Sequence, residues 1–304
     1  MRHPFRILLV VLAVLVAGIA VWSVAGPRDP AGSSADAPTA TPTPTAAPTP
    51  DRTQATSRPS PSARPTATRP SKKPTTEPRR KALPLRSITI ALDPGHQLGN
   101  RRFPRESNAL VPAGGFEKPC NTTGTATASG VPEATVTFRI ARAVEQRLGA
   151  LGAKVRMTRN SNSDDQWGPC VDARGQFGER VGAQAMVSLH ADGASAQARG
   201  FHVLAPTRRT PWTADIAGSS LRLAKSLRDA LSVSGLPPAN YTGEGTGLNV
   251  RDDLGTLNLS DVPVAMVEIG NMRNSGDADQ MTSTSGQARQ ADVLVRGIRT
   301  FLGR

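Results

Sequence analysis

The chain has 304 residues and a formal net charge of +13, yet only 38% of its residues are hydrophobic and only 4% are aromatic. Apolar residues dense enough to build a core begin near residue 87, so the composition excludes a chain that folds along its whole length. No internal repeat is visible, which argues against a repeat architecture.

The N-terminal residues have the composition of an export signal. Residues 7–25 form an uncharged apolar run that follows Arg2, His3 and Arg6, a pattern typical of a secretory signal or a signal anchor. The run is just long enough to span a bilayer, whereas Ser23-Val24-Ala25 resembles a small-residue cleavage site. We predict that residues 1–26 are a signal peptide or an N-terminal membrane anchor and that the protein is exported.

A proline-rich segment follows at residues 27–86. It holds 14 of the 26 prolines and no aromatic residue, so we predict a disordered tether. The tether carries 11 Lys or Arg against four Asp or Glu, and thus most of the net charge. Because no basic face with interleaved aromatics occurs elsewhere, we do not expect nucleic acid as a partner. The tether favours an anionic polymer or a membrane surface, although its charges would also serve simply to keep it solvated.

Residues 87–304 alternate strand and helix patterns. A strand over 87–93 is ended by Pro94-Gly95 just before His96, and the loop that follows, 97–131, is long enough to suggest a functional role. A helix beginning at Pro132 places Glu133 in its first turn. Later elements are strands over 154–158, 185–189, 201–205 and 262–269 and helices over 171–182, 219–231 and 288–302.

This alternation predicts an α/β fold, with one twisted, largely parallel mixed sheet flanked by helices on both faces in a single domain. Sheets of this kind bind ligands outside the carboxyl ends of their strands. His96 follows the first strand, His190 ends the strand over 185–189, and Glu268 lies near the end of the strand over 262–269. We therefore expect these side chains at one edge of the sheet.

Two histidines and one glutamate are a common ligand set for catalytic zinc, and His96, Glu133 and His190 fit it. A nearby carboxylate is still needed to accept the proton of the attacking water, and Glu268 is the candidate. Taken singly, each residue has a structural alternative: a histidine at a strand end, Glu133 at the positive end of its helix dipole, and Glu268 in an ion pair with an arginine. Convergence of all four favours a mononuclear zinc hydrolase.

The two cysteines, Cys120 and Cys170, lie in polar segments that contain Gly and Pro. Because the chain is predicted to be exported and no CxxC pair is present, we predict a disulfide between them rather than a catalytic or metal-bound thiolate. The disulfide would anchor the 97–131 loop beside the crevice, where it could limit access and favour short substrates. The alternative is a surface loop that the disulfide holds in place but that does not limit access to the crevice.

Four sequence blocks in this order resemble the zinc-dependent N-acetylmuramoyl-L-alanine amidases of the amidase_3 type, in their compact actinobacterial form. The blocks are DPGH at 93–96, the helix block that opens with PEATVTF at 132–138, SLHAD at 188–192 and VPVAMVEIGN at 262–271. By this resemblance His96, Glu133 and His190 match the ligands of one zinc ion, and Glu268 matches the essential glutamate of the family.

The resemblance implies a monomeric enzyme in the cell wall that acts on peptidoglycan or muropeptides. It would hydrolyse the amide between the lactyl group of N-acetylmuramic acid and the L-alanine of the stem peptide. Two alternatives stay open. One is a zinc carboxypeptidase or endopeptidase that acts on stem peptides, and the other is a cell-wall-binding module without catalysis, although the presence of Glu268 argues against the module.

Overall fold

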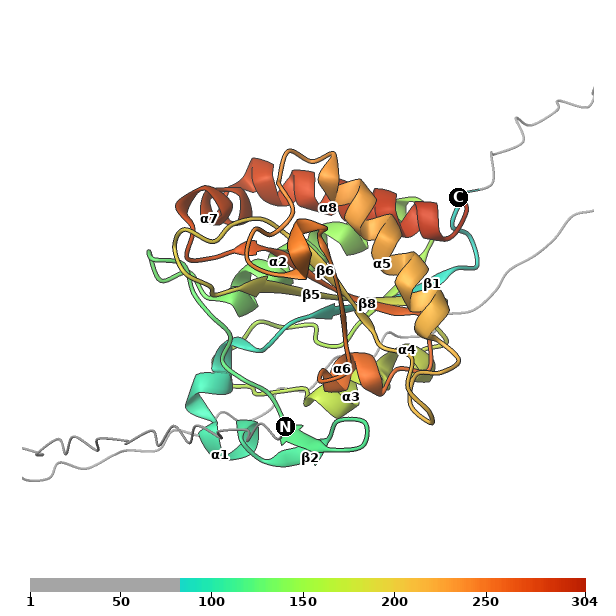
Figure 1. Cartoon of the computed structure of the whole chain (residues 1–304), viewed down its shortest axis with the longest axis horizontal. Helices are drawn as coiled ribbons and strands as arrows, with labels where there is room; N and C mark the ends of the chain where they lie inside the picture. The colour runs from blue at the N-terminus through green and yellow to red at the C-terminus, as the bar shows by residue number, and fades with distance from the viewer. Residues whose placement is uncertain (1–82) are drawn as a thin grey trace, which may run out of the picture. The chain divides into compact units, whose positions relative to one another are not determined.

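A six-stranded sheet forms the centre of the computed structural model, which describes residues 83–304 (Figure 1). The strand order is β4 (Lys154–Met157), β1 (Thr89–Pro94), β5 (Ala185–Asp192), β8 (Val264–Asn271), β6 (His202–Pro206) and β7 (Leu248–Arg251). The first four strands of this order are mutually parallel, whereas β6 pairs with β8 in antiparallel fashion. The prediction of a largely parallel mixed sheet is therefore confirmed.

Three long helices cover one face of the sheet: α2 (Glu133–Ala150), α5 (Ala217–Ser232) and α8 (Thr284–Phe301) (Figure 1). Their apolar residues recur at helical spacing, and fully buried examples are Ile140, Leu227 and Leu294. Leu85 is also fully buried in this core, and its backbone N–H donates to Leu151 O at 2.9 Å. The core thus includes a residue from the end of the segment predicted to be a tether.

Short helices cover the opposite face: α3 (Val171–Gly175), α4 (Phe177–Arg180) and α6 (Gly255–Asn258) (Figure 1). The sequence predicts one helix over 171–182, but the chain breaks at Gln176 into α3 and α4. Two glycines explain the break, because Gly175 lies against the backbone of α6 and a Cβ at Gly178 would overlap Val262. The two glycines let α3 and α4 pack closely against α6 and against Val262, just before β8, at the expense of helix continuity.

The segment over 97–131, predicted to be a loop, contains short regular elements. They are η1 (Leu98–Arg102), α1 (Pro104–Ser107) and an antiparallel hairpin of β2 (Leu110–Pro112) and β3 (Glu117–Pro119). Cys120 follows the hairpin and forms the predicted disulfide with Cys170, directly before α3. The elements α7 (Ser275–Thr282) and η2 (Gly243–Gly245) complete the described part of the chain.

A buried ion pair joins the end of β1 to α3. Arg174 is 2% exposed and donates from Nη1 to the fully buried carboxylate of Asp93, which also accepts hydrogen bonds from Ser188 Oγ at 2.7 Å and Thr158 Oγ1 at 2.6 Å. Burial alone would raise the pKa of Asp93, but the Arg174 charge and these hydrogen bonds hold it below its usual value. The pair therefore stays ionised inside the fold.

The predicted signal or anchor (residues 1–26) and most of the predicted tether (27–86) lie outside the described residues. Within residues 83–304, no helix combines the length and the apolar character needed to cross a bilayer.

We predict that Arg174→Met lowers the free energy of unfolding by about 3–5 kcal/mol, because it leaves the Asp93 charge buried without a partner. Urea unfolding of the variant and the parent would measure the change. Arg102→Met is the control, since the ion pair of Arg102 with Asp165 is at the surface and its loss should change the free energy of unfolding by at most about 1 kcal/mol. Equal losses in the two variants would contradict the prediction.

Candidate metal centre and active site

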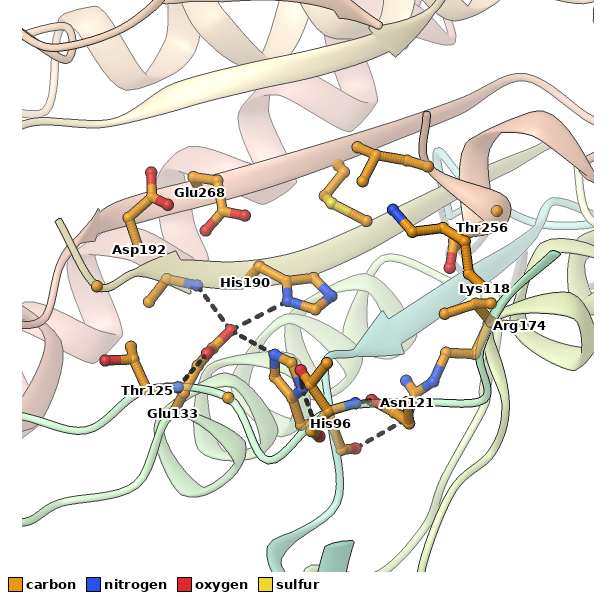
Figure 2. Close-up of a pocket in the computed structure, with 18 of the residues that line it drawn as sticks. His96, Lys118, Asn121, Thr125, Glu133, Arg174, His190, Asp192, Thr256 and Glu268 are labelled. Carbon is orange, nitrogen blue, oxygen red and sulfur yellow. Dashed lines mark hydrogen bonds and ion pairs between the residues drawn. The ribbon is translucent and has the colours of Figure 1, made fainter. Parts of the chain in front are cut away.

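Three side chains from separate elements converge on one point (Figure 2). His96 follows β1, Glu133 begins α2, and His190 lies in β5. Glu133 Oε1 lies 3.1 Å from His96 Nε2 and 3.0 Å from His190 Nδ1, and the ligand atoms of the three residues lie within 4.8 Å of one another. The two imidazole rings meet edge to face with centroids 4.8 Å apart. Three donors this close could hold one metal ion.

The backbone around His96 is adapted to this convergence. His96 adopts a positive φ of 57°, which is uncommon for a residue other than glycine. Its Nδ1 lies 3.0 Å from Thr122 O, and in the Nδ1–H tautomer it donates there, so that the lone pair of Nε2 is kept for a metal ion. A Cβ at Gly95 would overlap the His190 ring. The DPGH turn therefore lets the two imidazoles approach.

The carboxylate of Glu133 is also held by two backbone N–H groups. Oε1 accepts from Ala191 N–H at 3.1 Å, and Oε2 accepts from Thr125 N–H at 3.0 Å. Gly124, at a φ of +74°, allows the backbone to pass closely, because a Cβ there would lie 2.7 Å from Oε2. The sequence predicts Pro132 as the first residue of this helix. In the structure Pro132 is the N-cap of α2, and Glu133 is the first helical residue.

The pKa values of the two carboxylates of the site, Glu133 and Glu268, are shifted in opposite directions. Burial would raise the pKa of Glu133, but the charges and hydrogen bonds of His96 and His190 hold it far below its usual value. Burial would lower the pKa of His96, yet Glu133 raises it overall. The pKa of Glu268 is raised well above its usual value, first by burial and then by the negative charges of Asp192 and Glu133. Glu133 is therefore a permanent anion, and Glu268 readily takes up a proton.

Glu268 lies in β8 between two histidines of the neighbouring strands. Its register partners are His190 on β5 and His202 on β6. Within the described residues, its Oε2 is buried and has no hydrogen-bond partner. Figure 2 shows the Glu268 carboxylate beside Asp192 and above the His190 ring. A buried carboxylate oxygen without a partner suits a group that handles a proton of the substrate or of water.

A second polar cluster adjoins Glu268 and has no counterpart in the sequence-based prediction. Asp192 Oδ2 accepts hydrogen bonds from His202 Nε2 and from the Tyr241 hydroxyl, each at 2.7 Å. Burial and the Asp192 charge raise the pKa of Tyr241, so its hydroxyl stays protonated. Asp192 is two residues after His190 on the same strand, and this period of two was the only signal that could have placed it near the site.

The converging residues line a cavity of about 370 Å³. Its wall includes Lys118, Asn121 and Thr122 from the segment that Cys120 anchors, together with Arg174 and Thr256. The loop therefore borders the cavity, as expected. Arg251 forms a two-point ion pair with Asp253 at 2.8 and 2.7 Å.

Comparisons with known proteins identify the family of the chain. A family model described as N-acetylmuramoyl-L-alanine amidase (Amidase_3) matches residues 90–300. An N-acetylmuramoyl-L-alanine amidase of Mycobacterium tuberculosis is 41% identical over 218 residues, which are 71% of this chain and 86% of that protein.

Two solved structures are similar over nearly their whole length. The amidase Ami1 of Mycobacterium smegmatis is 41% identical with a TM-score of 0.67, over 72% of this chain and 98% of that chain. Ami1 of Mycobacterium abscessus is 40% identical with a TM-score of 0.67, over 72% of this chain and all of that chain (100%). The chain therefore belongs to the N-acetylmuramoyl-L-alanine amidase family.

Proposed function

We propose that this chain is an exported, zinc-dependent N-acetylmuramoyl-L-alanine amidase. Its substrate is peptidoglycan or its muropeptide fragments, in which it hydrolyses the amide between the lactyl group of N-acetylmuramic acid and L-alanine. The observation that carries the proposal is the convergence of His96, Glu133 and His190 beside Glu268 in one cavity. Membership of the amidase family supports the choice of substrate.

The three converging residues fit a zinc ion. Two imidazoles and one carboxylate are a usual donor set for catalytic zinc and leave a further position free. The hydrogen bond of His96 Nδ1 to Thr122 O is the outer contact that fixes the tautomer of a metal-binding imidazole. Zinc bound by these residues would lower the pKa of a water molecule to about 7 and polarise the carbonyl of the amide.

Glu268 is the proposed proton carrier. Its carboxylate accepts a proton from the water that attacks the lactyl carbonyl carbon. The same proton then passes to the amide nitrogen as the carbon–nitrogen bond breaks, which releases the stem peptide with a free amine. The surroundings that raise the pKa of Glu268 favour uptake of that proton. The hydrogen bonds that Asp192 accepts from His202 and Tyr241 keep its charge in place near Glu268.

The location of the enzyme is also part of the proposal. The disulfide between Cys120 and Cys170 supports an oxidising compartment outside the cytoplasm. Residues 1–26 would direct export, as an anchor or a cleaved signal, and the basic residues 27–86 would hold the monomeric enzyme near anionic wall polymer or membrane surface.

Replacement of the proton carrier tests the reaction itself. Glu268→Gln should lower kcat about 10²–10⁴-fold while zinc stays bound, because Gln cannot transfer the proton. The assay is mass spectrometry of a digested muropeptide: the parent should release the sugar with a free lactyl group and an intact peptide. A shortened peptide would indicate a carboxypeptidase or endopeptidase instead. Glu145→Gln on α2 is the control and should keep full activity.

Removal of one proposed ligand tests the metal set. His190→Ala should lose most of its zinc, because two donors seldom hold the ion tightly. His202→Gln is a matched control: His202 is buried close by, but it contacts Asp192 and not Glu133, so its replacement should leave the zinc content unchanged. Metal analysis of the purified proteins gives the answer, and full zinc occupancy in His190→Ala would show that the set is wrong.

Zinc binding should also depend on pH. Zinc requires neutral imidazole, whereas Glu133 raises the pKa of His96 above 6.5 and so favours its protonated form. Zinc affinity should therefore be full at alkaline pH and fall as the pH is lowered through the raised pKa, by about tenfold per unit once His96 is protonated. Metal titration of zinc-free protein between about pH 5 and 8 would measure this. A constant affinity over that range would contradict the assignment of His96.

A further inference from the structure

Residues 83–304 contain two tryptophans, and both lie at the surface instead of in the core. Trp212 is 36% exposed and lines a groove of about 460 Å³ on the face that carries α4 and α6. The remaining walls of this Trp212 groove are mainly polar and include Gln176, Glu179, Arg180 and Asp261. The Trp212 groove thus combines one exposed indole with planar polar side chains.

The chemistry of the Trp212 groove matches a sugar ring. One face of a pyranose carries C–H groups that pack on an indole, while its hydroxyl and acetamido groups hydrogen-bond to amide, carboxylate and guanidinium side chains. The carboxylates of Glu179 and Asp261 outnumber the single guanidinium of Arg180, which disfavours a polyanion such as nucleic acid or a phosphate-rich polymer.

The Trp212 groove is adjacent to the catalytic cavity. Gly255 and Thr256 of α6 line the cavity, and Asn258 of the same helix lines the groove. Thr256 and Asn258 are two residues apart, which is about 3 Å along the helix axis, so neighbouring residues of α6 line the two hollows. In the proposed substrate every cleavable amide is attached to a sugar of the glycan strand. A cavity that holds this amide must therefore have the strand running close beside it.

The β2–β3 hairpin connects the same two places. Lys118 of the hairpin lines the cavity, while Gly115 at its tip lies against the indole, so that a Cβ at Gly115 would be 3.1 Å from Trp212 Nε1. The guanidinium of Arg209 lies over the Phe116 ring at 5.8 Å from its centroid. Asn258 Nδ2 donates to Ala113 O at 2.9 Å and thereby ties α6 to the hairpin. Trp212 is thus held at a defined place beside the cavity.

We infer that the Trp212 groove is a glycan-binding subsite that takes an amino-sugar ring of the strand next to the muramyl residue being cleaved. The inference rests on the proposed amidase function and extends it, since it makes a polymeric substrate bind better than a fragment too short to reach α4.

The second exposed indole supplies a matched control. Trp167 is 41% exposed, close to the exposure of Trp212. It lines a separate groove of about 460 Å³, the same volume as that of the Trp212 groove. Cys170 lines the Trp167 groove, and Arg174, which lines the catalytic cavity, is buried between the two hollows. None of the residues that line the Trp167 groove lies on α6 or on the β2–β3 hairpin, the two elements that connect the Trp212 groove to the cavity.

The test compares full-length Trp212→Ala and Trp167→Ala on two substrates. On intact glycan polymer, Trp212→Ala should raise KM by roughly tenfold with little change in kcat, as expected for loss of an aromatic anchor. On a muramyl peptide with a single sugar, it should act like the parent. Trp212→Phe should recover most of the polymer activity, and Trp167→Ala should match the parent on both substrates.

Binding of peptide-free glycan strands to the Glu268→Gln protein, with and without Trp212→Ala, separates this inference from the proposed reaction. If the strands bind and Trp212→Ala weakens their binding, the result supports the subsite even though no amide is cleaved. Equal polymer losses in the two tryptophan variants, or a loss on the single-sugar substrate as large as on polymer, would overturn it. If Trp212→Ala does not fold, Asp261→Ala on the exposed rim of the groove replaces it, and unchanged strand binding there would also overturn the inference.

Discussion

The buried charge pair of Asp93 and Arg174 is the interaction on which the candidate centre depends. Arg174 donates from Nη2 to His96 O at 2.8 Å and from Nη1 to Pro94 O at 2.9 Å, and thereby fixes the turn that presents His96. Through Nε it also donates to Pro169 O at 2.8 Å, next to the disulfide. One guanidinium thus joins the end of β1, the cysteine-anchored segment and α3. Because neither charge can be buried alone, the strand end and the wall of the cavity are held together.

The sequence predicted the parts of the site that lie on long regular elements. The apolar period of α2 located Glu133, and the short apolar runs of β5 and β8 located His190 and Glu268 at one edge of the sheet. These signals are strong because core burial imposes a period on the residues around each site residue. The order of the motifs then indicated the amidase family. The boundaries of these elements differed by a few residues. Strand β5, for example, continues past His190 to Asp192, because β8 pairs with it there after a shift in register.

Tertiary contacts determine what the sequence did not predict. Strands β2 and β3 have three residues each, and α6 has four, so none of them is long enough to show a period. Arg174 was assigned to a helix without a role, since nothing in its neighbours reveals that it reaches Asp93, 81 residues earlier in the chain. The contacts among Asp192, His202 and Tyr241 join β5, β6 and a loop, and they become visible only once β6 is known to run antiparallel to β8.

The account requires that one metal ion lie among His96, Glu133 and His190, with Glu268 near it but not bound to it. A crystal structure of the zinc-loaded protein, with anomalous data collected on both sides of the zinc absorption edge, tests this most directly. The account predicts a single anomalous peak about 2.0–2.2 Å from one atom of each of the three side chains. A peak elsewhere, or one that lacks either imidazole as a ligand, would contradict it.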